Sequence, residues 1–301
     1  MASDLQDVRM SDGCNIKAKI LGHGPDKPLL LTVHGAPGLS THRETEAWCG
    51  PFADIFRVLV FDLRGCGESD KQRPYTHARW IQDVDELRQW AKADKFVMIG
   101  GSNGGFLTLD YALAYQQHLY GIIVSDTAAQ QGHWGLMNML KTALTNNRIK
   151  PDPDQVLRMF SGRCIDQMDL LTGFGSIAAL YESPPEVKEH AEVDVGSVLS
   201  GATVPFYEAA NAAMGDCLSR YDVRDRLKEI KVPAFVGVGR YDWVTPVSCG
   251  EELEAGLPTS KLVIYERSGH FPGLEEKTKF QKDVREFVKT MDVPGLKWVK
   301  A

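Results

Sequence analysis

A serine among glycines is the feature that most constrains the fold of this chain. Ser102 stands at the centre of the sequence GGSNG, between the apolar run 96–99 and the apolar stretch 106–111. This order predicts a strand, a sharp turn and a helix, a setting that lifts a serine hydroxyl clear of a sheet. Glycines on both sides are needed, because side chains there would collide with the neighbouring strand or helix. A glycine-rich turn with a capping serine is an alternative interpretation of this segment. A phosphate-binding loop does not fit, because the segment lacks a lysine after the glycines and the G-x-G-x-x-G spacing.

Short apolar runs rich in β-branched residues predict the rest of a sheet. They have the composition of buried parallel strands and alternate with helical segments, the clearest of which are 77–93 and 275–291. This alternation predicts an α/β fold with a mostly parallel sheet covered by helices on both faces. The predicted strands are residues 28–33, 57–61, 96–99, 121–124, 234–238 and 261–265.

The alternation stops in the middle of the chain, where only helical patterns occur. We therefore predict a core domain of residues 1–127 and 231–301, and an inserted helical cap of residues 128–230. The expected cap helices are residues 133–144, 154–160, 167–180 and 204–213.

A serine hydroxyl is a weak nucleophile until a base takes its proton, so Ser102 requires a histidine and a carboxylate later in the chain. Asp242 follows the fifth predicted strand, and His270 follows the sixth. The carboxyl ends of parallel strands share one edge of a sheet, so these side chains are expected to converge there. Asp126, after the fourth strand, is the alternative acid. We predict Ser102, Asp242 and His270 as a catalytic triad.

The negative charge that forms when serine attacks a carbonyl needs fixed N–H donors. The backbone N–H of Asn103, directly after the serine, can supply one. The first predicted strand runs into the tight turn 34–38, which can present the N–H of Ala36. Ala36 and Asn103 are the predicted oxyanion hole.

Charge and composition limit the classes of partner and the cellular location that we expect for this protein. A formal net charge of -6 argues against a nucleic-acid partner. The acidic, polar start of the chain and the absence of a long apolar run predict a cytoplasmic protein that does not enter a membrane. Six scattered cysteines predict free thiols rather than a metal site or disulfides. We expect no cofactor and no metal, a small-molecule substrate, and a monomer or homodimer.

These segments together resemble the α/β-hydrolase superfamily, and within it the proline iminopeptidase-like branch of serine hydrolases. The resemblance implies the α/β-hydrolase fold, with a cap that selects the substrate. The segments that carry it are residues 34–38, 61–69, 100–105, 239–242 and 268–270.

Three departures from that pattern concern the substrate. Ala36 replaces a glycine, Asn103 stands where aromatic residues are common, and Trp243 follows the triad acid. Relatives that remove N-terminal residues use an acidic side chain to hold the substrate ammonium group, which Trp243 cannot do. We predict Trp243 as a substrate-binding residue. The cap acids that could take the ammonium role are Glu182, Glu186 and Glu208.

The sequence thus predicts a cofactor-independent hydrolase of an ester, lactone or amide bond. The alternatives are an aminopeptidase, a carbon-carbon bond hydrolase or lyase on the same triad, and a ligand receptor that is not catalytic. Cys66 is a weaker candidate nucleophile, because no histidine pairs with it in the sequence. An apolar pocket wall is expected from the cap residues Met137, Met139, Met159 and Phe160.

Overall fold

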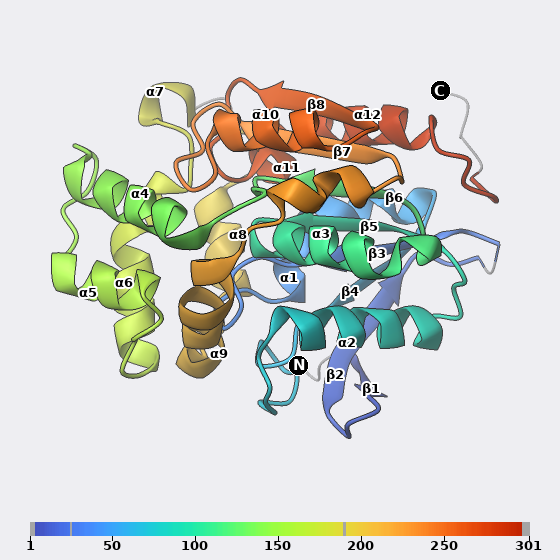
Figure 1. Cartoon of the computed structure of the whole chain (residues 1–301), viewed down its shortest axis with the longest axis horizontal. Helices are drawn as coiled ribbons and strands as arrows, with labels where there is room; N and C mark the ends of the chain where they lie inside the picture. Colours follow the sequence, from blue (N-terminus) through green and yellow to red (C-terminus); the bar gives the residue numbers. More distant parts are fainter. Residues whose placement is uncertain (1–3, 25, 189–190, 297–301) are drawn as a thin grey trace.

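The computed structural model describes residues 4–24, 26–188 and 191–296. Its described residues form one eight-stranded sheet in the order β1-β2-β4-β3-β5-β6-β7-β8, which runs through the middle of the molecule (Figure 1). The strands from β3 to β8 are parallel, and β1 and β2 are antiparallel. Their bounds are β1 Gln6–Arg9, β2 Asn15–Leu21, β3 Leu29–Val33, β4 Arg57–Phe61, β5 Phe96–Gly101, β6 Leu119–Ser125, β7 Ala234–Gly239 and β8 Ser260–Tyr265.

The expected α/β-hydrolase architecture is confirmed, and each predicted strand is present. The two antiparallel strands at the edge were not predicted. β2 nevertheless carries a signal, since Ile16 and Ala18 are buried and alternate with the more exposed Lys17 and Lys19. A strand with only one face buried against the core produces this alternation.

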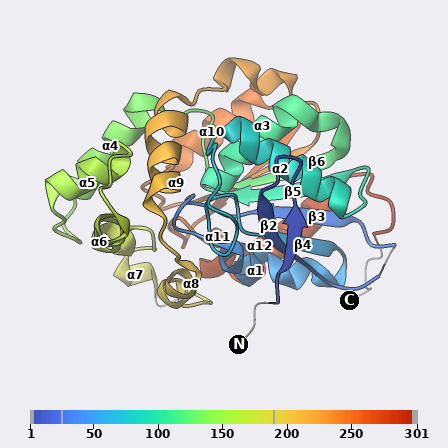
Figure 2. The same ribbon diagram turned by 90° about the horizontal axis from the view of Figure 1, so that it is seen from below.

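Helices cover both faces of the sheet (Figure 2). Successive strand residues point to opposite faces, so Leu31 packs in one apolar cluster and Leu30 in the other. The first face is covered by α2 His77–Trp90, α3 Asn103–Tyr115 and α10 Val247–Gly256, and the second by α1 His42–Cys49, α11 Pro272–Glu275 and α12 Lys277–Val288.

Helices without strands fill the segment between β6 and β7, beside the sheet in Figure 1. The two ends of this insertion lie next to each other, because Gln130 and Asp222 form a β-bridge and the Val223 N–H donates to the Ala129 carbonyl at 2.8 Å. Two of its helices, α7 and α8, were not predicted. The helices are α4 Gly132–Thr145, α5 Pro153–Phe160, α6 Gln167–Ile177, α7 Pro185–Lys188, α8 Val195–Ala202 and α9 Tyr207–Asn211.

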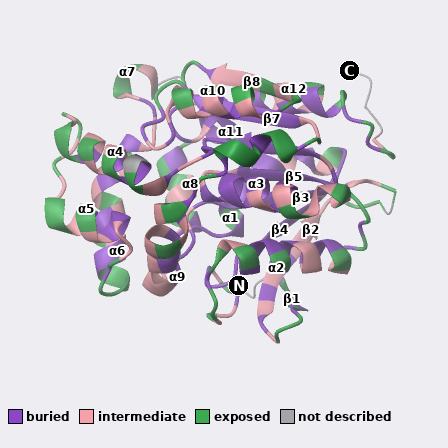
Figure 3. Ribbon diagram, in the orientation of Figure 1, coloured by how far each residue is buried: buried purple, intermediate pink, exposed green. Residues whose placement is uncertain are grey.

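Burial follows this layered arrangement. Figure 3 shows the central strands as buried and the outer faces of the helices as exposed. A third apolar cluster lies mainly in the insertion, where it includes Met159, Phe160 and Leu170, and it also contains Leu39 and Trp243 from outside the insertion. No helix among the described residues is long and apolar enough to cross a membrane.

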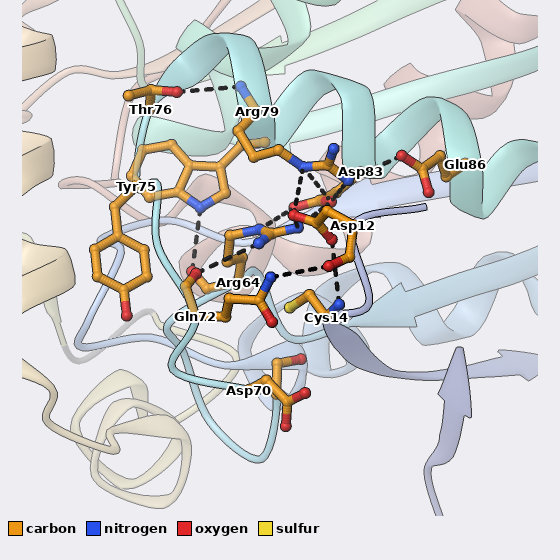
Figure 4. A network of polar contacts seen from close by, with 12 residues as sticks. Asp12, Cys14, Arg64, Asp70, Gln72, Tyr75, Thr76, Arg79, Asp83 and Glu86 are labelled. Atoms are coloured by element: carbon orange, nitrogen blue, oxygen red, sulfur yellow. Dashed lines mark hydrogen bonds and ion pairs between the residues drawn. The ribbon is translucent and has the colours of Figure 1, made fainter. Parts of the chain in front are cut away.

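A buried ion-pair network fixes the loop after β4 to helix α2 (Figure 4). The Arg64 guanidinium donates to both carboxylate oxygens of Asp83 at 2.9 Å. Arg79 donates to the same carboxylate at 2.9 Å, and Asp12 in the turn between β1 and β2 accepts from Arg64 at 2.8 Å. The fork of a guanidinium matches a carboxylate geometrically, so the pairing is directional as well as ionic. It connects the edge of the sheet to the segment that follows β4.

Candidate active site

Ser102 lies at the sharp turn between β5 and α3. Its backbone has φ 51° and ψ −119°, a left-handed conformation that is strained for a residue with a side chain. The turn is fixed by the Ser102 N–H, which donates to the Ser125 carbonyl at 2.9 Å. Strain held in this way is typical of functional positions.

The glycines two residues before and two residues after Ser102 leave no room for side chains. A Cβ atom at Gly100 would overlap the carbonyl oxygen of Gly104 in α3, and one at Gly104 would overlap the carbonyl oxygen of Val33 in β3. The expected collisions with helix and strand are therefore present, and they explain why both positions are glycine.

His270 and Asp242 form a buried pair at the ends of β8 and β7. The ring Nδ1–H of His270 donates to Asp242 Oδ2 at 2.8 Å. Asp242 also accepts from the Thr245 hydroxyl at 2.8 Å and from the N–H groups of Val244 and Thr245 at 2.8 and 3.1 Å. These bonds hold the carboxylate, and the carboxylate sets the ring tautomer that leaves Nε2 as an acceptor.

The remaining ring nitrogen of His270 is available to accept a proton. His270 Nε2 is buried and has no hydrogen-bond partner in the described part of the chain. Ser102 and His270 line two cavities together. The structure therefore places all three predicted triad residues at one edge of the sheet. Among these residues only the His270–Asp242 hydrogen bond is formed.

Asp126, the alternative acid, lies beside this pair. Its carboxylate accepts from the Gly239 N–H at 3.1 Å and from the Ser125 hydroxyl at 2.6 Å. Burial and the nearby Asp242 charge raise the pKa of Asp126 well above its ordinary value. The Asp126 carboxyl therefore keeps its proton to higher pH than an ordinary aspartate does. Asp242 makes the contact to His270.

Asp126, Asp242 and His270 also form a group of possible metal ligands. Among the described residues they are the one set of three or more His, Cys, Asp or Glu residues whose ligand atoms all lie within 4.8 Å of one another. His270 Nδ1 and Asp242 Oδ2 are bonded to each other, however. A metal ion would have to displace that hydrogen bond, so the donor set fits a hydrogen-bonded acid-base pair better than a metal site.

The loop that carries His270 is tied to the insertion. His270 N–H donates to the Tyr181 carbonyl at 2.7 Å. The Glu275 carboxylate accepts from the N–H groups of Gly269 and Ser183, both at 2.8 Å, and so joins the two segments. Burial raises the pKa of Glu275, against the lowering effect of these N–H groups. This role of Glu275 could not be recognised from the sequence, in which Glu275 is only the first residue of a predicted helix.

The predicted oxyanion donors lie next to the serine. A Cβ atom on Gly35 would come within 3.4 Å of Ser102 Cβ, which places the loop after β3 against the turn at Ser102. Ala36 and Asn103 line one cavity with Ser102. Neither backbone N–H has a hydrogen-bond acceptor among the described residues, and that of Asn103 lies at the N-terminus of α3.

Glu44 in α1 is a further acidic group at the site. Its buried carboxylate accepts from the Gly35 N–H at 3.2 Å and from the Ser40 hydroxyl. It lines both cavities that Ser102 and His270 share. The sequence offered no motif that would have marked Glu44, which looks like an ordinary acid of a surface helix.

The larger cavity beside Ser102 has about 730 Å³ of empty space, part of it open to solvent, and apolar side chains dominate its lining. The predicted wall residues Met139, Met159 and Phe160 contribute to it. The expectation for Met137 is wrong, because that side chain is 59% exposed on the outer face of α4. Side chains two positions apart on a helix point in different directions, so Met137 and Met139 cannot line the same wall.

Trp243, the predicted substrate-binding residue, lies behind that wall. It is buried and packs near the rings of Phe160 and Tyr181, at centroid distances of 6.2 and 5.4 Å. Its successors Val244 and Thr245 line the larger cavity, whereas Trp243 is not among the described lining residues of the cavities at Ser102. The indole thus supports residues that form the surface of the cavity.

The remaining candidates lie away from the cavities at Ser102. The described residues that line these cavities do not include Glu182, Glu186 or Glu208. The Glu208 carboxylate instead pairs with the Arg73 guanidinium at 2.7 Å. Cys66 is buried and accepts from the Gly38 N–H at 3.1 Å. Burial raises the pKa of its thiol to about 12, which disfavours the thiolate that a nucleophile requires.

Comparisons with known proteins agree with the fold. The family model for the alpha/beta hydrolase fold matches residues 28–277, so the chain belongs to this family. Within the family it lies in the proline iminopeptidase-like branch. It is 30% identical over 298 residues to a proline iminopeptidase of Saccharolobus solfataricus, covering 92% of this chain and 89% of that protein.

Solved structures show the same fold. A hydrolase from Pseudomonas aeruginosa PA01 superposes with a TM-score of 0.75 at 25% identity, over 96% of this chain and 99% of that chain. An enol-lactonase from Burkholderia xenovorans LB400 also has a TM-score of 0.75, at 18% identity, over 94% and 100% of the two chains. The second likeness concerns the fold alone.

Proposed function

We propose that this protein is a cofactor-independent serine hydrolase that cleaves an ester, lactone or amide bond of a small molecule. Ser102 is the nucleophile, His270 the base and Asp242 the residue that orients His270. The observation that carries the proposal is the buried 2.8 Å hydrogen bond from His270 to Asp242, with Ser102 on the same cavities as the histidine.

The proposed reaction has two stages. His270 Nε2 accepts the Ser102 proton as the hydroxyl oxygen attacks the substrate carbonyl, and the N–H groups of Ala36 and Asn103 hold the resulting oxyanion. The imidazolium gives its proton to the leaving group, which departs and leaves an acyl-enzyme. Water then attacks with His270 as the base, which releases the acid and restores Ser102.

We use the position of His270 to assign the leaving group and the acyl group of the substrate to different cavities. The leaving group receives its proton from His270, so it must lie on the histidine side, in the cavities that His270 lines. The acyl group then occupies the larger cavity, which Ser102, Ala36 and Asn103 line but His270 does not. We call this larger cavity the acyl cavity. Residues 128–230, proposed as the cap domain, supply much of its wall.

An aminopeptidase is the second candidate, favoured by the relationship to proline iminopeptidases. In that reaction the substrate's ammonium group belongs to the acyl part, so it would enter the acyl cavity. No acidic side chain is among the described residues that line this cavity. Glu44 is acidic but lies on the leaving-group side. Uncharged acyl groups therefore suit the cavity better than N-terminal amino acids.

A comparison of substrates tests the proposal. We expect purified protein to hydrolyse p-nitrophenyl butanoate or a simple lactone with a higher kcat/KM than prolyl-7-amido-4-methylcoumarin, and Ser102→Ala to abolish both activities. A preference for the prolyl amide would favour the aminopeptidase. Hydrolysis of a vinylogous 1,5-diketone but of no ester or amide would favour the carbon-carbon hydrolase. No turnover and no reaction of Ser102 would favour a receptor.

A further inference from the structure

The Asn103 side chain is a polar group without a protein partner at the acyl cavity. The residue is 3% exposed, and both its Oδ1 and its Nδ2 atoms are buried without a hydrogen-bond partner in the described structure. Asn103 also lines the acyl cavity. Asn103 thus lies in the wall of a mainly apolar cavity and carries a buried hydrogen-bond acceptor and a buried donor that have no protein partner among the described residues.

This arrangement is costly for the folded protein. Buried polar atoms in proteins are nearly always hydrogen-bonded, because an unmet donor or acceptor has lost its interactions with water. Leucine has the same number of side-chain heavy atoms as asparagine, with the same branching, and would contact the surrounding side chains without that cost. The backbone N–H, which is the proposed oxyanion donor, does not require an amide side chain either. The carboxamide therefore needs another reason.

A second carboxamide borders the same cavity. Gln131 is buried, and its Nε2 atom contacts Met139 Sδ at 2.9 Å. A thioether is a weak acceptor, so this contact satisfies the amide poorly. Binding pockets of this kind combine apolar walls with a few polar groups that fix the orientation of a ligand.

We propose that Asn103 is a specificity-determining residue that binds a hydrogen-bonding group on the acyl part of the substrate. The inference rests on the proposed function, because it uses the acyl side defined by His270. The substrate class is an ester or lactone whose acyl chain carries a hydroxyl, a carbonyl or an amide within a few bonds of the scissile carbonyl. The short spacing follows from the sequence, since adjacent residues have Cα atoms about 3.8 Å apart and Ser102 precedes Asn103 directly.

Matched p-nitrophenyl esters test this recognition. 3-Hydroxybutanoate and 3-oxobutanoate are compared with pentanoate, and N-acetylglycinate with the similarly shaped 4-methylpentanoate. The leaving group is constant, so the ratio of kcat/KM values within a pair reports recognition of the acyl group after correction for the uncatalysed rates. We expect the wild type to prefer the polar member of at least one pair by about tenfold or more.

Asn103→Leu keeps the backbone donor and removes the carboxamide. We expect it to abolish the preference, so that the ratio of kcat/KM values within each pair falls to about one; a change in kcat common to both members of a pair cancels in this ratio. Thr127→Val is the matched control, because the Thr127 hydroxyl is also buried and unpartnered but is not among the lining residues of the acyl cavity. This control should keep the wild-type ratios. Asn103→Ser provides a second variant if the leucine variant does not fold.

Three results would overturn the inference. The wild type could prefer the apolar member of every pair, the preference could survive in both Asn103 variants, or Thr127→Val could abolish it equally. Each of these outcomes leaves the proposed function intact if Ser102→Ala is inactive toward pentanoate. Loss of the proposed function itself would appear differently, as no ester hydrolysis at all by folded wild-type protein, and it would overturn both conclusions.

Discussion

The backbone N–H of His270 donates a hydrogen bond to the carbonyl oxygen of Tyr181 at 2.7 Å. This bond joins the loop after the last strand to the helical insertion, and the Glu275 carboxylate joins the same two segments through Gly269 and Ser183. The position of the proposed base therefore depends on the insertion as well as on Asp242. A shift of the insertion would therefore displace the histidine.

The first prediction concerns Glu275→Gln. A glutamine has one acceptor oxygen where the carboxylate has two, so one of the two backbone N–H groups loses its partner. We expect a stability loss of about 1–3 kcal/mol and, since misplacement of a reacting group by about 1 Å can cost about 10²-fold, a fall in kcat of that order. Urea unfolding and ester hydrolysis measure both.

The matched control for that variant is Glu266→Gln, which removes an exposed carboxylate paired with Arg240 at 2.6 Å. It should change stability by no more than about 1 kcal/mol and leave kcat unchanged. Wild-type kcat in Glu275→Gln would contradict the coupling between the insertion and the histidine loop.

The second prediction separates the two buried aspartates. Asp242→Asn should lower kcat by about 10⁴-fold, because the amide cannot hold the histidine tautomer that accepts a proton. Asp126→Asn should lower kcat by less than about tenfold, since Asp126 is held by Gly239 and Ser125 rather than by His270. The reverse order of effects would make Asp126 the triad acid. Folding of both variants is checked by circular dichroism.

The third prediction is a pH dependence of stability. Burial and Asp242 raise the pKa of Asp126 in the folded protein, so the folded state keeps this proton to higher pH than the unfolded state does. As pH rises from the unfolded pKa towards the raised folded pKa, the wild type loses stability relative to a variant that does not titrate there.

Asparagine tolerates the left-handed backbone at position 126, where φ is 50°. The stability of Asp126→Asn minus that of the wild type should therefore increase with pH above about pH 4, by no more than about 1.4 kcal/mol per pH unit. Urea unfolding at a series of pH values measures the difference. A constant difference between pH 4 and pH 8 would show that the pKa of Asp126 is not raised.

The fourth prediction concerns the buried network of Figure 4. Asp83→Asn leaves the Arg64 guanidinium, which is fully buried, without its main counter-charge. We expect a loss of about 3–5 kcal/mol in the free energy of unfolding. Glu229→Gln, which removes an exposed partner of Arg226, should cost no more than about 1 kcal/mol. Equal effects of the two substitutions would mean that burial does not strengthen the network.

Much of the fold follows from local sequence signals. The central strands are buried on both faces, so they are continuous apolar runs that can be recognised without a structure. Ser102, Asp242 and His270 stand directly after such runs, which is why their shared edge of the sheet could be predicted. Their roles in catalysis stay predictions.

The features that were missed depend on tertiary contacts. Glu44 and Glu275 look like surface acids in the sequence, and only the folded chain shows that their buried carboxylates accept hydrogen bonds from backbone N–H groups of distant segments. Met137 was misplaced because composition does not say which face of a cap helix is turned inward. The carboxamide of Asn103 was noted only as a departure from a motif, since its isolation among apolar side chains belongs to the assembled cavity.

The most direct test of the central claim is covalent labelling of Ser102. Folded wild-type protein is treated with a fluorophosphonate, digested, and analysed by mass spectrometry to locate the added phosphonyl group. The account predicts one modified peptide with the group on Ser102, no modification in Ser102→Ala or in denatured protein, and a loss of turnover in Ser102→Ala of about 10⁶-fold. An unlabelled Ser102 in folded, active protein, or turnover within a few fold of wild type in Ser102→Ala, would contradict it.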